Sequence, residues 1–512
     1  MNKRNNNKKN FNGKRRRFPS PLQREKLNQL VLRLLQLAQD EPSNPNEEWQ
    51  QYEAIQTQLQ LILEQEEPIQ RAVCPPQVDD QTRLAKIAAF SEWAKAGGIH
   101  SDGVEIAIFP GYQMGLRATK DINPDQQVLR VPRKKIFSEE QLSKTERESF
   151  CNFTTNFNLA NALVVEKSRG ADSIWKPYID VLPSRYNTVL YFTVEQMRRL
   201  RGTSVCSSAL RQCRMIARKY AKLYAFAYCD SSYLRPDASL FTQHGLCYEL
   251  YRWAVSTVMT RQNLVPREIA TKDDANSPIS ALIPCWDMAN HRPGKITSFY
   301  DSNAHQMDCT AQEFCKAGNQ FFIYYGDRPN ADLLVHNGFV DPNNTKDFVN
   351  IRLGLSPTDG LAEKRSRLLD RLNIEHKGEF RVLPAPEYIS GQLLAFVRVF
   401  NMSSDQLDHW CSDLERAVDL LHIDCALETD LETRTWQYFH QRFKLLLGVL
   451  EATLREADEL KQMAELQLAE AQDDKQQQQQ DQGIDLMLLQ YRRLERRILS
   501  DALEYAKERC KV

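Results

Sequence analysis

Apolar side chains recur every third or fourth residue in the first part of the chain, which is the spacing of an amphipathic helix. One such stripe runs from Leu27 to Leu37 and a second from Trp49 to Ile62. The segment between them holds two prolines and an Asp-Glu pair, which break helices. Asn46, followed by two glutamates, is typical of an N-cap at the start of the second helix. We therefore expect a pair of antiparallel helices.

A further amphipathic helix is predicted over residues 83–96, ending at Gly97-Gly98. Short segments that follow are rich in β-branched and aromatic residues and alternate like strands. Helical spacing then returns over about residues 138–262, and strand and turn patterns return over 283–340. The expected strands after the first glycine pair are 104–109, 115–118 and 127–131.

From about residue 355 to the end the pattern is almost wholly helical. Asp473–Gly483, which contains five consecutive glutamines, is predicted to be a flexible loop between two helices. The order of elements predicts an α+β protein, in which a β domain with a helical insert precedes a helical domain. The expected boundaries are a tail at 1–19, a helical segment at 20–82, the β domain at 83–345 with its insert at about 138–262, and an all-helical domain at 346–512.

Composition narrows the class of protein. The 512 residues are too many for one ordinary core, and 42% hydrophobic with 26% charged residues is typical of globular proteins. A formal net charge of zero predicts no general attraction to nucleic acid, and no long apolar run predicts a membrane span or a signal core. Twelve unevenly spaced cysteines indicate reduced thiols in a cytoplasmic or nuclear protein, without zinc-ligand spacing and hence without a metal site.

The first eighteen residues hold eight Lys or Arg and no acid, which predicts a disordered basic tail. Lys14–Arg17 is compatible with a nuclear localisation signal, whereas a solvated tail without a targeting role is the simpler interpretation.

Two short motifs carry the candidate chemistry. Ile283–His291 is an apolar, strand-like run that includes Trp286 and ends in Asn290-His291. Phe321–Arg328 is a second β-type run that ends in Tyr324-Tyr325-Gly326. Each motif alone is unspecific, because an aromatic residue at a strand end is more often part of a core.

Tyr324 is expected to take that core role, because strand alternation turns it to the side opposite Tyr325. Asp327 is expected to be the N-cap of a helix over residues 328–336, which ends at Asn337-Gly338.

Together, in this order and spacing, the two motifs resemble those of SET-domain methyltransferases. The resemblance implies a SET domain at 83–345, S-adenosylmethionine as cofactor and Tyr325 as the catalytic hydroxyl. Arginines would hold the cofactor carboxylate, because a guanidinium is always charged and grips two oxygens. The implied cofactor-binding residues are Arg83, Tyr112, Gln113, Met114, Arg261, Asp287, Met288, Ala289, Asn290, His291, Asn337, Gly338 and Phe339.

One position departs from the family pattern. The family has Gly-x-Gly before Leu-Arg, which gives the backbone room to wrap around the cofactor. Here Gln113 stands at the first glycine and Gly115 at the second.

The resemblance extends to the Rubisco-methyltransferase-like branch, whose C-terminal helical domain binds the substrate protein. Pieces such as Trp175–Tyr178, Tyr251–Asn263 and Gln392–Phe396 look like those of histidine-methylating members that act on actin. This implies actin as the partner of a protein that is otherwise a monomer, and no nucleic acid or membrane partner.

The residues themselves also favour a histidine substrate. Lysine-methylating relatives usually have an aromatic or apolar residue where Asn263 stands, and Tyr where Asn337 stands. An amide offers a partner to the non-reacting nitrogen of a neutral imidazole, and Trp286 offers a flat face for stacking. Arg328 would lie at the mouth of the channel. Asn263 would then join Tyr325 in catalysis, although a helix C-cap is the plainer role for it.

Two other functions remain open from the sequence. One is a lysine methyltransferase for a non-histone protein, which a histidine-to-lysine substrate would distinguish. The other is an inactive adaptor that binds a partner through its helical domain, which would be expected to lose Tyr325, Arg261 or Asn290-His291.

Overall fold

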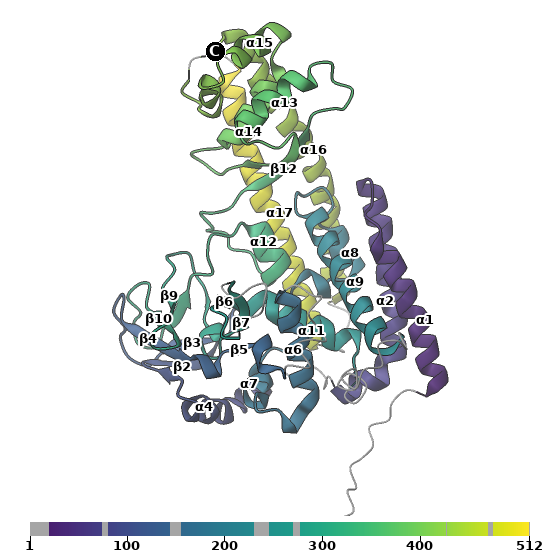
Figure 1. The fold of residues 1–512 in the computed structure, drawn as a ribbon, viewed down its shortest axis with the longest axis vertical. Coiled ribbons are helices and arrows are strands. Elements are labelled where there is room, and N and C mark those ends of the chain that lie inside the picture. Colours follow the sequence, from purple (N-terminus) through teal and green to yellow (C-terminus); the bar gives the residue numbers. More distant parts are fainter. Residues whose placement is uncertain are drawn as a thin grey trace, which may run out of the picture.

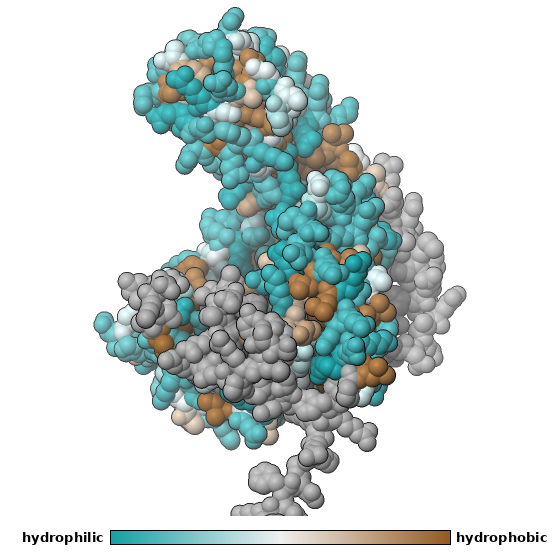
Figure 2. Space-filling model, turned by 45° about the vertical axis from the view of Figure 1, so that its right-hand side comes forward, coloured by the Kyte–Doolittle hydropathy of each residue, from teal (hydrophilic) through white to brown (hydrophobic). Residues whose placement is uncertain are grey.

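The computed structural model of this chain describes residues 20–73, 80–143, 155–229, 245–269, 277–425, 427–468 and 475–510. The predicted basic tail lies outside these ranges. Figure 1 shows a broad lower lobe and a narrower upper lobe, connected by two long helices, α16 (Thr429–Leu468) and α17 (Lys475–Arg509). Figure 2 shows that the molecule is hollowed between the lobes, with mostly hydrophilic residues around the hollow. Among the described residues, no helix is both long enough and apolar enough to cross a membrane.

The predicted N-terminal helix pair is present as α1 (Pro21–Gln39) and α2 (Pro45–Val73), and both helices pack on α9 (Cys206–Tyr228). The predicted N-cap was wrong by two residues. Asn44, not Asn46, accepts hydrogen bonds from the backbone N–H groups of Asn46 and Glu47, at 3.1 and 3.0 Å. Proline suits the first helical position, because its missing N–H is not needed there, so α2 begins at Pro45.

The predicted helix over 83–96 is divided in two. α3 (Asp80–Leu84) and α4 (Ile87–Ala96) are separated by a turn, and both lie against α7 (Lys176–Val181). The turn allows α3 to direct Arg83 inward, while α4 buries Phe90 and Ala94 on its own face.

The strands form small sheets rather than one large sheet. Their hydrogen-bonded orders are β1-β4-β10-β9, β2-β3-β11-β8, β5-β7-β6 and β12-β13. The pairing is antiparallel except between β8 and β11, which run parallel. The strands in the lower lobe are β1 (His100–Ser101), β2 (Val104–Phe109), β3 (Gln113–Ala118), β4 (Gln127–Pro132), β5 (Phe137–Ser138), β6 (Gln262–Val265), β7 (Ile279–Leu282), β8 (Asn290–His291), β9 (Ser298–Asp301), β10 (Gln306–Thr310) and β11 (Gln320–Ile323).

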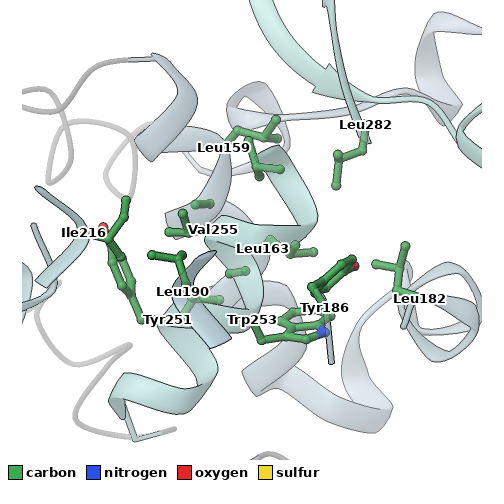
Figure 3. Close-up of a cluster of buried hydrophobic side chains, with 14 of the residues drawn as sticks. Leu159, Leu163, Leu182, Tyr186, Leu190, Ile216, Tyr251, Trp253, Val255 and Leu282 are labelled. Atoms are coloured by element: carbon green, nitrogen blue, oxygen red, sulfur yellow. The ribbon is translucent and has the colours of Figure 1, made fainter. Parts of the chain in front are cut away.

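The predicted helical spacing over 138–262 corresponds to α6 (Thr155–Arg169), α7, α8 (Val194–Arg198), α9 and α11 (Tyr248–Arg261). Figure 3 shows apolar side chains of α6 and α11 packed together, among them Leu163 and Val255. The same core includes the N-terminal helices and most of the strands, so the residues before about 340 share one hydrophobic core.

The prediction of an all-helical domain over 346–512 was wrong in one respect: among its described residues, helices are accompanied by one antiparallel strand pair, β12 (Val349–Gly354) with β13 (Lys377–Val382). Its other helices are α13 (Ala362–Arg371), α14 (Gly391–Asn401) and α15 (Ser404–Ser412). The prediction of a loop through Asp473–Gly483 was wrong from residue 475 onward, because the glutamine run forms the first turns of α17. Glutamine is a good helix former, and low complexity alone does not prevent a helix.

Helix α17 belongs to two cores. Its first half packs into the core of the lower lobe through Ile484, Met487, Leu488 and Tyr491. Its second half packs into the core of the upper lobe through Ile498, Leu499, Ala502 and Ala506. The two lobes are therefore joined by a continuous buried stripe at helical spacing, in addition to the chain connection before β12.

Candidate active site

The two motifs predicted to carry the chemistry lie side by side. In the parallel pair β8–β11, Phe322 is opposite Asn290 and Ile323 is opposite His291. Tyr325 follows directly, and its backbone N–H donates to His291 Nδ1 at 3.2 Å. Pairing of short strands thus brings together residues that are more than thirty positions apart in the chain.

A cavity of about 160 Å³ opens beside this pair. It collects side chains from the end of α11, from β6, from the turn after β7 and from the segment after β11. Predicted site residues that line it are Arg261, Asn263, Trp286, Asp287, Ala289, Tyr325, Arg328 and Asn337.

Tyr325 has the geometry of a held hydroxyl group. Its Oη donates to the carbonyl oxygen of Ala289 at 2.9 Å. Burial raises the pKa of this hydroxyl to about 12, so it stays protonated near neutral pH. Tyr325 can therefore orient a reacting group without changing its own charge.

The prediction for Tyr324 was wrong. We expected strand alternation to turn it into the core, but β11 ends at Ile323 and the alternation ends with it. Tyr324 lines the same cavity as Tyr325. Its hydroxyl donates to Asp327, so this aspartate is not the expected helix N-cap. The helix begins three residues later, as α12 (Asn330–Asp332), and continues as the π-helix η8 (Leu333–Asn337) before stopping at Gly338 as expected.

We had expected Trp286 to lie in a strand. It instead follows a tight turn. The chain leaves β7, passes Cys285 at a φ of 69°, and enters a short 3₁₀-helix, η7 (Trp286–Met288). A positive φ is strained for cysteine, and such strain is concentrated at functional sites. The indole is 9% exposed and donates from Nε1 to Ser298 Oγ at 2.6 Å, which fixes the ring plane.

Arg261 is the last residue of α11 and is held by Asp287. Its Nη1 donates to the Asp287 carbonyl at 2.7 Å and lies 3.3 Å from the Asp287 carboxylate. The Tyr178 hydroxyl donates to the same carboxylate at 2.6 Å. Burial raises the pKa of Asp287, whereas Arg261 and Tyr178 act in the opposite direction, which fits a buried acceptor with two donors.

Arg83 lies apart from this cavity. It is buried, and its Nε and Nη2 donate to the Val181 carbonyl at 3.2 and 2.9 Å. Arg83 and Arg261 both act electrostatically to lower the pKa of Tyr186, although burial raises it overall. The two guanidinium groups therefore both lie near Tyr186.

Asn290 connects β8 to the loop of the glycine motif. Its Nδ2 donates to the carbonyl of Met114 at 3.1 Å. A Cβ atom on Gly115 would lie 2.8 Å from this nitrogen, so only glycine allows the contact. Gln113 adopts a φ of 58°, a conformation that favours glycine. The residue that departs from the family pattern thus adopts a backbone conformation that glycine favours.

Tyr112, a predicted cofactor contact, lines a neighbouring cavity of about 300 Å³ instead. It is 51% exposed, and its ring meets that of Phe322 edge-on at 5.4 Å. His291 lies between this region and Tyr325, with ring contacts to Tyr324, Tyr325 and Phe339. Burial lowers the pKa of His291, while the Asp341 carboxylate acts in the opposite direction and the Arg328 charge adds to the lowering. Met288 is buried in the lower core and is 3.7 Å from Arg261 through its sulfur.

Asn263 and Asn337 differ in how they are engaged. Asn263 lies in β6, after Gln262 has capped α11, so its plainer role as the helix C-cap was wrong. Its Oδ1 accepts from the Leu264 N–H at 2.8 Å and keeps a second lone pair. Asn337 accepts from Arg328 Nη1 at 3.0 Å and donates to the Thr260 carbonyl at 3.5 Å.

Several residues at the site carried no usable signal in the sequence. Tyr178 lies more than a hundred positions from Asp287, and Thr260 and Ser298 are ordinary hydroxyl residues whose contacts depend on tertiary structure. Tyr324 had a signal, since it adjoins Tyr325, but the end of β11 could not be located closely enough to use it.

Comparison with known proteins identifies the chain's relatives. The Rubisco LSMT substrate-binding family model matches residues 356–499. The chain is 60% identical to the actin-histidine N-methyltransferase of Drosophila melanogaster, covering 96% of this chain and 90% of that protein. It is 32% identical to the protein of the same name from Xenopus tropicalis, over 96% of this chain and 80% of that one.

Solved structures with the same fold include Rubisco LSMT bound to AdoMet, with a TM-score of 0.64 at 18% identity over 83% of this chain and 92% of that chain. The SET domain of LSMT bound to lysine and AdoHcy also has a TM-score of 0.64, at 18% identity. These likenesses confirm the predicted α+β SET fold with its helical C-terminal region. By its sequence identity to these relatives along nearly its own whole length, this chain belongs to the actin-histidine N-methyltransferase family.

Proposed function

We propose that this protein transfers one methyl group from S-adenosylmethionine to a ring nitrogen of a histidine in actin. The actin substrate follows from the names of its relatives. The observation that carries the histidine preference is that Asn263, Trp286 and Tyr325 line one cavity. A flat aromatic face, an amide and a hydroxyl group suit a planar imidazole better than a thin alkyl ammonium.

The residues present fit the cofactor. Gly115 leaves the space that a Cβ would fill, and Asn290 reaches the loop carbonyl across it. Arg261 and Arg83 would hold a carboxylate, and His291 and Phe339 would flank an aromatic ring. When bound, S-adenosylmethionine supplies a sulfonium methyl group, which a nitrogen lone pair can take in a single displacement.

The chain's own residues would prepare the nucleophile. Asn263 Oδ1 would accept the N–H of the non-reacting nitrogen, which fixes the tautomer and directs the lone pair of the other nitrogen. Trp286, fixed by Ser298, would hold the ring plane. The guanidinium of Arg328 disfavours a second positive charge nearby, so it would keep the substrate imidazole neutral.

The bonds and charges balance without a metal or a redox partner. The imidazole nitrogen forms the new N–C bond, and the electron pair of the breaking C–S bond goes to sulfur. The methylated ring is then cationic, and it returns to neutrality when its N–H proton leaves to solvent. The Tyr325 hydroxyl would keep the reacting groups aligned throughout, since its pKa lies far above neutral pH.

The proposal is tested by incubating the protein with actin and isotope-labelled S-adenosylmethionine, followed by mass spectrometry of the actin. We expect one methyl group on a histidine ring. Label on lysine would favour the rival lysine methyltransferase, and no label with intact cofactor binding would favour the inactive adaptor. A peptide in which lysine replaces the target histidine should be a poorer substrate than the native peptide.

A further inference from the structure

Asn330 is a buried polar residue beside the active site that does not face the cavity. It is the first residue of α12 and is 1% exposed. Its backbone N–H and its Nδ2 donate to the two oxygens of Asp347, at 2.8 and 2.6 Å. Its Nδ2 also donates to the carbonyl of Asp341 at 3.0 Å, and its Oδ1 accepts from the Asp341 N–H at 2.8 Å.

These contacts connect two parts of the molecule. Asp341 and Asp347 lie in the linker, residues 341–348. The linker leads from the lower lobe, which contains the candidate active site and is called the catalytic lobe below, to β12 of the upper, C-terminal lobe. Asn344 of the linker donates from Nδ2 to the carbonyl of Arg328 at 2.7 Å. The linker is therefore hydrogen-bonded to the segment after β11 at both Arg328 and Asn330.

Arg328 is the residue through which these contacts reach the cavity. It lines the cavity and donates to Asn337, which also lines it. The segment between them is bounded by Gly326 and Gly338, whose φ angles are 96° and 76°. Leu333 and Leu334 anchor the far side of this segment in the core. At its start, the segment is held by the linker contacts to Arg328 and Asn330.

Asp347 is suited to this task because it is nearly enclosed. It is 9% exposed, and it also accepts from its neighbour's N–H, that of Phe348, at 3.0 Å. Burial raises the pKa of its carboxyl group, while the hydrogen bonds from Asn330 and Phe348 oppose that shift. Loss of the Asn330 donors would leave the Asp347 carboxylate buried with fewer hydrogen bonds, which costs free energy. The two side chains are therefore expected to keep their contacts together.

We propose that Asn330 and Asp347 are positioning residues for methyl transfer, which hold Arg328 and Asn337 at the cavity by fastening them to the linker of the C-terminal domain. The inference rests on the proposed function, because it assigns Arg328 to the substrate side of that reaction. It makes the attachment of the C-terminal domain part of the active-site geometry. The domain that docks the protein substrate would thereby also set the wall of the pocket that receives the target side chain.

The first experiment compares kcat and KM in the full-length variants Asn330→Ala, Asp347→Asn and Asn344→Ala. Both actin and a short peptide that contains the target histidine serve as substrates. We expect kcat to fall about ten- to a hundred-fold with either substrate, because small displacements of positioning groups have effects of that size. Affinity for S-adenosylhomocysteine, measured by calorimetry, should fall much less than kcat, because the hydrogen bonds that hold Arg261 and Asn290 do not involve the linker.

The matched control is Asn343→Ala, an exposed asparagine of the same linker whose side chain lies outside these contacts. It should leave kcat unchanged. Thermal unfolding identifies any variant that fails to fold, and Asn344→Ala, at a partly exposed position, carries the test if Asn330→Ala does not fold. Unchanged kcat in folded Asn344→Ala and Asp347→Asn would overturn the inference.

A double-mutant cycle separates positioning from general stability. If Asn330 acts through Arg328, then Asn330→Ala should add less than about two-fold to the loss caused by Arg328→Gln. Full multiplication of the two losses would mean independent action and would also overturn the inference. If the wild-type protein methylates no histidine at all, the proposed function fails; a fully active Asn330→Ala variant beside an active wild type refutes only the inference.

Discussion

At the scale of single residues, the cavity brings together groups with different tasks. Tyr325 offers a hydroxyl group that stays neutral, Trp286 a fixed aromatic face and Asn263 an amide. None of the three is a strong acid or base near neutral pH, which suits a reaction whose nucleophile carries its own lone pair. In the proposed reaction these side chains would therefore contribute orientation more than proton transfer.

Replacing Tyr325 by phenylalanine should separate turnover from cofactor binding. The variant loses the hydroxyl group that donates to the Ala289 carbonyl, and kcat should fall about ten- to a hundred-fold. Affinity for S-adenosylhomocysteine, measured by calorimetry, should be nearly unchanged. Tyr438→Phe, in the C-terminal domain, is the control and should affect neither quantity. An equal loss of turnover and affinity in Tyr325→Phe would reject the catalytic role.

A second substitution tests the close approach of the glycine loop to β8. In Gly115→Ala the new methyl group would lie 2.8 Å from Asn290 Nδ2 and would push the amide from the Met114 carbonyl. Cofactor binding should weaken by about 1 kcal/mol or more. Isothermal titration with S-adenosylhomocysteine measures this. Gly360→Ala, where nothing lies within 4 Å of the added atom, should bind normally. Normal binding by Gly115→Ala would mean that Asn290 does not support the cofactor site.

Residue chemistry was predictable from the sequence where a motif fixed it, and not where geometry did. Asn290, His291 and Tyr325 could be singled out because their types and order are specific as a set, and the structure places them side by side. Tyr324 was misassigned because its direction depends on where β11 ends, and strand ends are poorly defined by residue type. Asn330 and Asp347 were missed because an Asn–Asp pair has no signature until the linker folds back.

At the scale of elements, the long periodic helices were the most predictable features and the short strands the least. α1, α2 and α11 follow from apolar spacing, which is repeated over several turns. β8 has only two residues, and no pattern of that length can reveal its parallel pairing with β11. The glutamine run of α17 shows the opposite error, in which composition suggested a loop although helix propensity favoured a helix.

Glu66 is a buried acid between α2 and α9, and it should make the stability of the protein depend on pH. Glu66 accepts from the Tyr220 hydroxyl and from the Tyr248 N–H, and burial raises its pKa to about 8. The folded protein then binds a proton that the unfolded chain releases above about pH 4.5. Stability should therefore decline as the pH rises from about 4.5 to 8.

Replacing Glu66 by glutamine should remove this contribution. Urea unfolding at several pH values should give a flatter dependence for Glu66→Gln than for the wild type, and greater stability at pH 8. Glu64→Gln changes an exposed acid on the same helix and should leave the dependence as it is. An unchanged dependence in Glu66→Gln would mean that Glu66 is ionised in the folded state at neutral pH.

At the scale of the whole molecule, α17 makes the two lobes depend on each other. Its first half fills the core of the catalytic lobe, and its second half fills the core of the C-terminal lobe. The boundary near residue 346 is therefore where the chain crosses between lobes, but it is not where the first core ends. Sequence patterns predicted a boundary near residue 346 and could not show the return of α17, because its apolar stripe continues unchanged through both cores.

This arrangement predicts that the intact protein unfolds in one transition. Separation of the lobes would expose Ile484, Met487 and Leu488, so neither core is expected to survive the loss of the other. Scanning calorimetry should give one peak whose calorimetric and van 't Hoff enthalpies agree. Two resolved peaks would show that the lobes are independent.

The two-core helix also sets the order of events when the chain is made. Ribosomes release a chain from its N-terminus, and domains commonly fold as they emerge. Here the catalytic lobe lacks Ile484, Met487, Leu488 and Tyr491 until most of the C-terminal lobe has been synthesised. The nascent catalytic lobe therefore presents an apolar surface throughout translation of the C-terminal lobe, and a chaperone that recognises such surfaces would bind it during that interval.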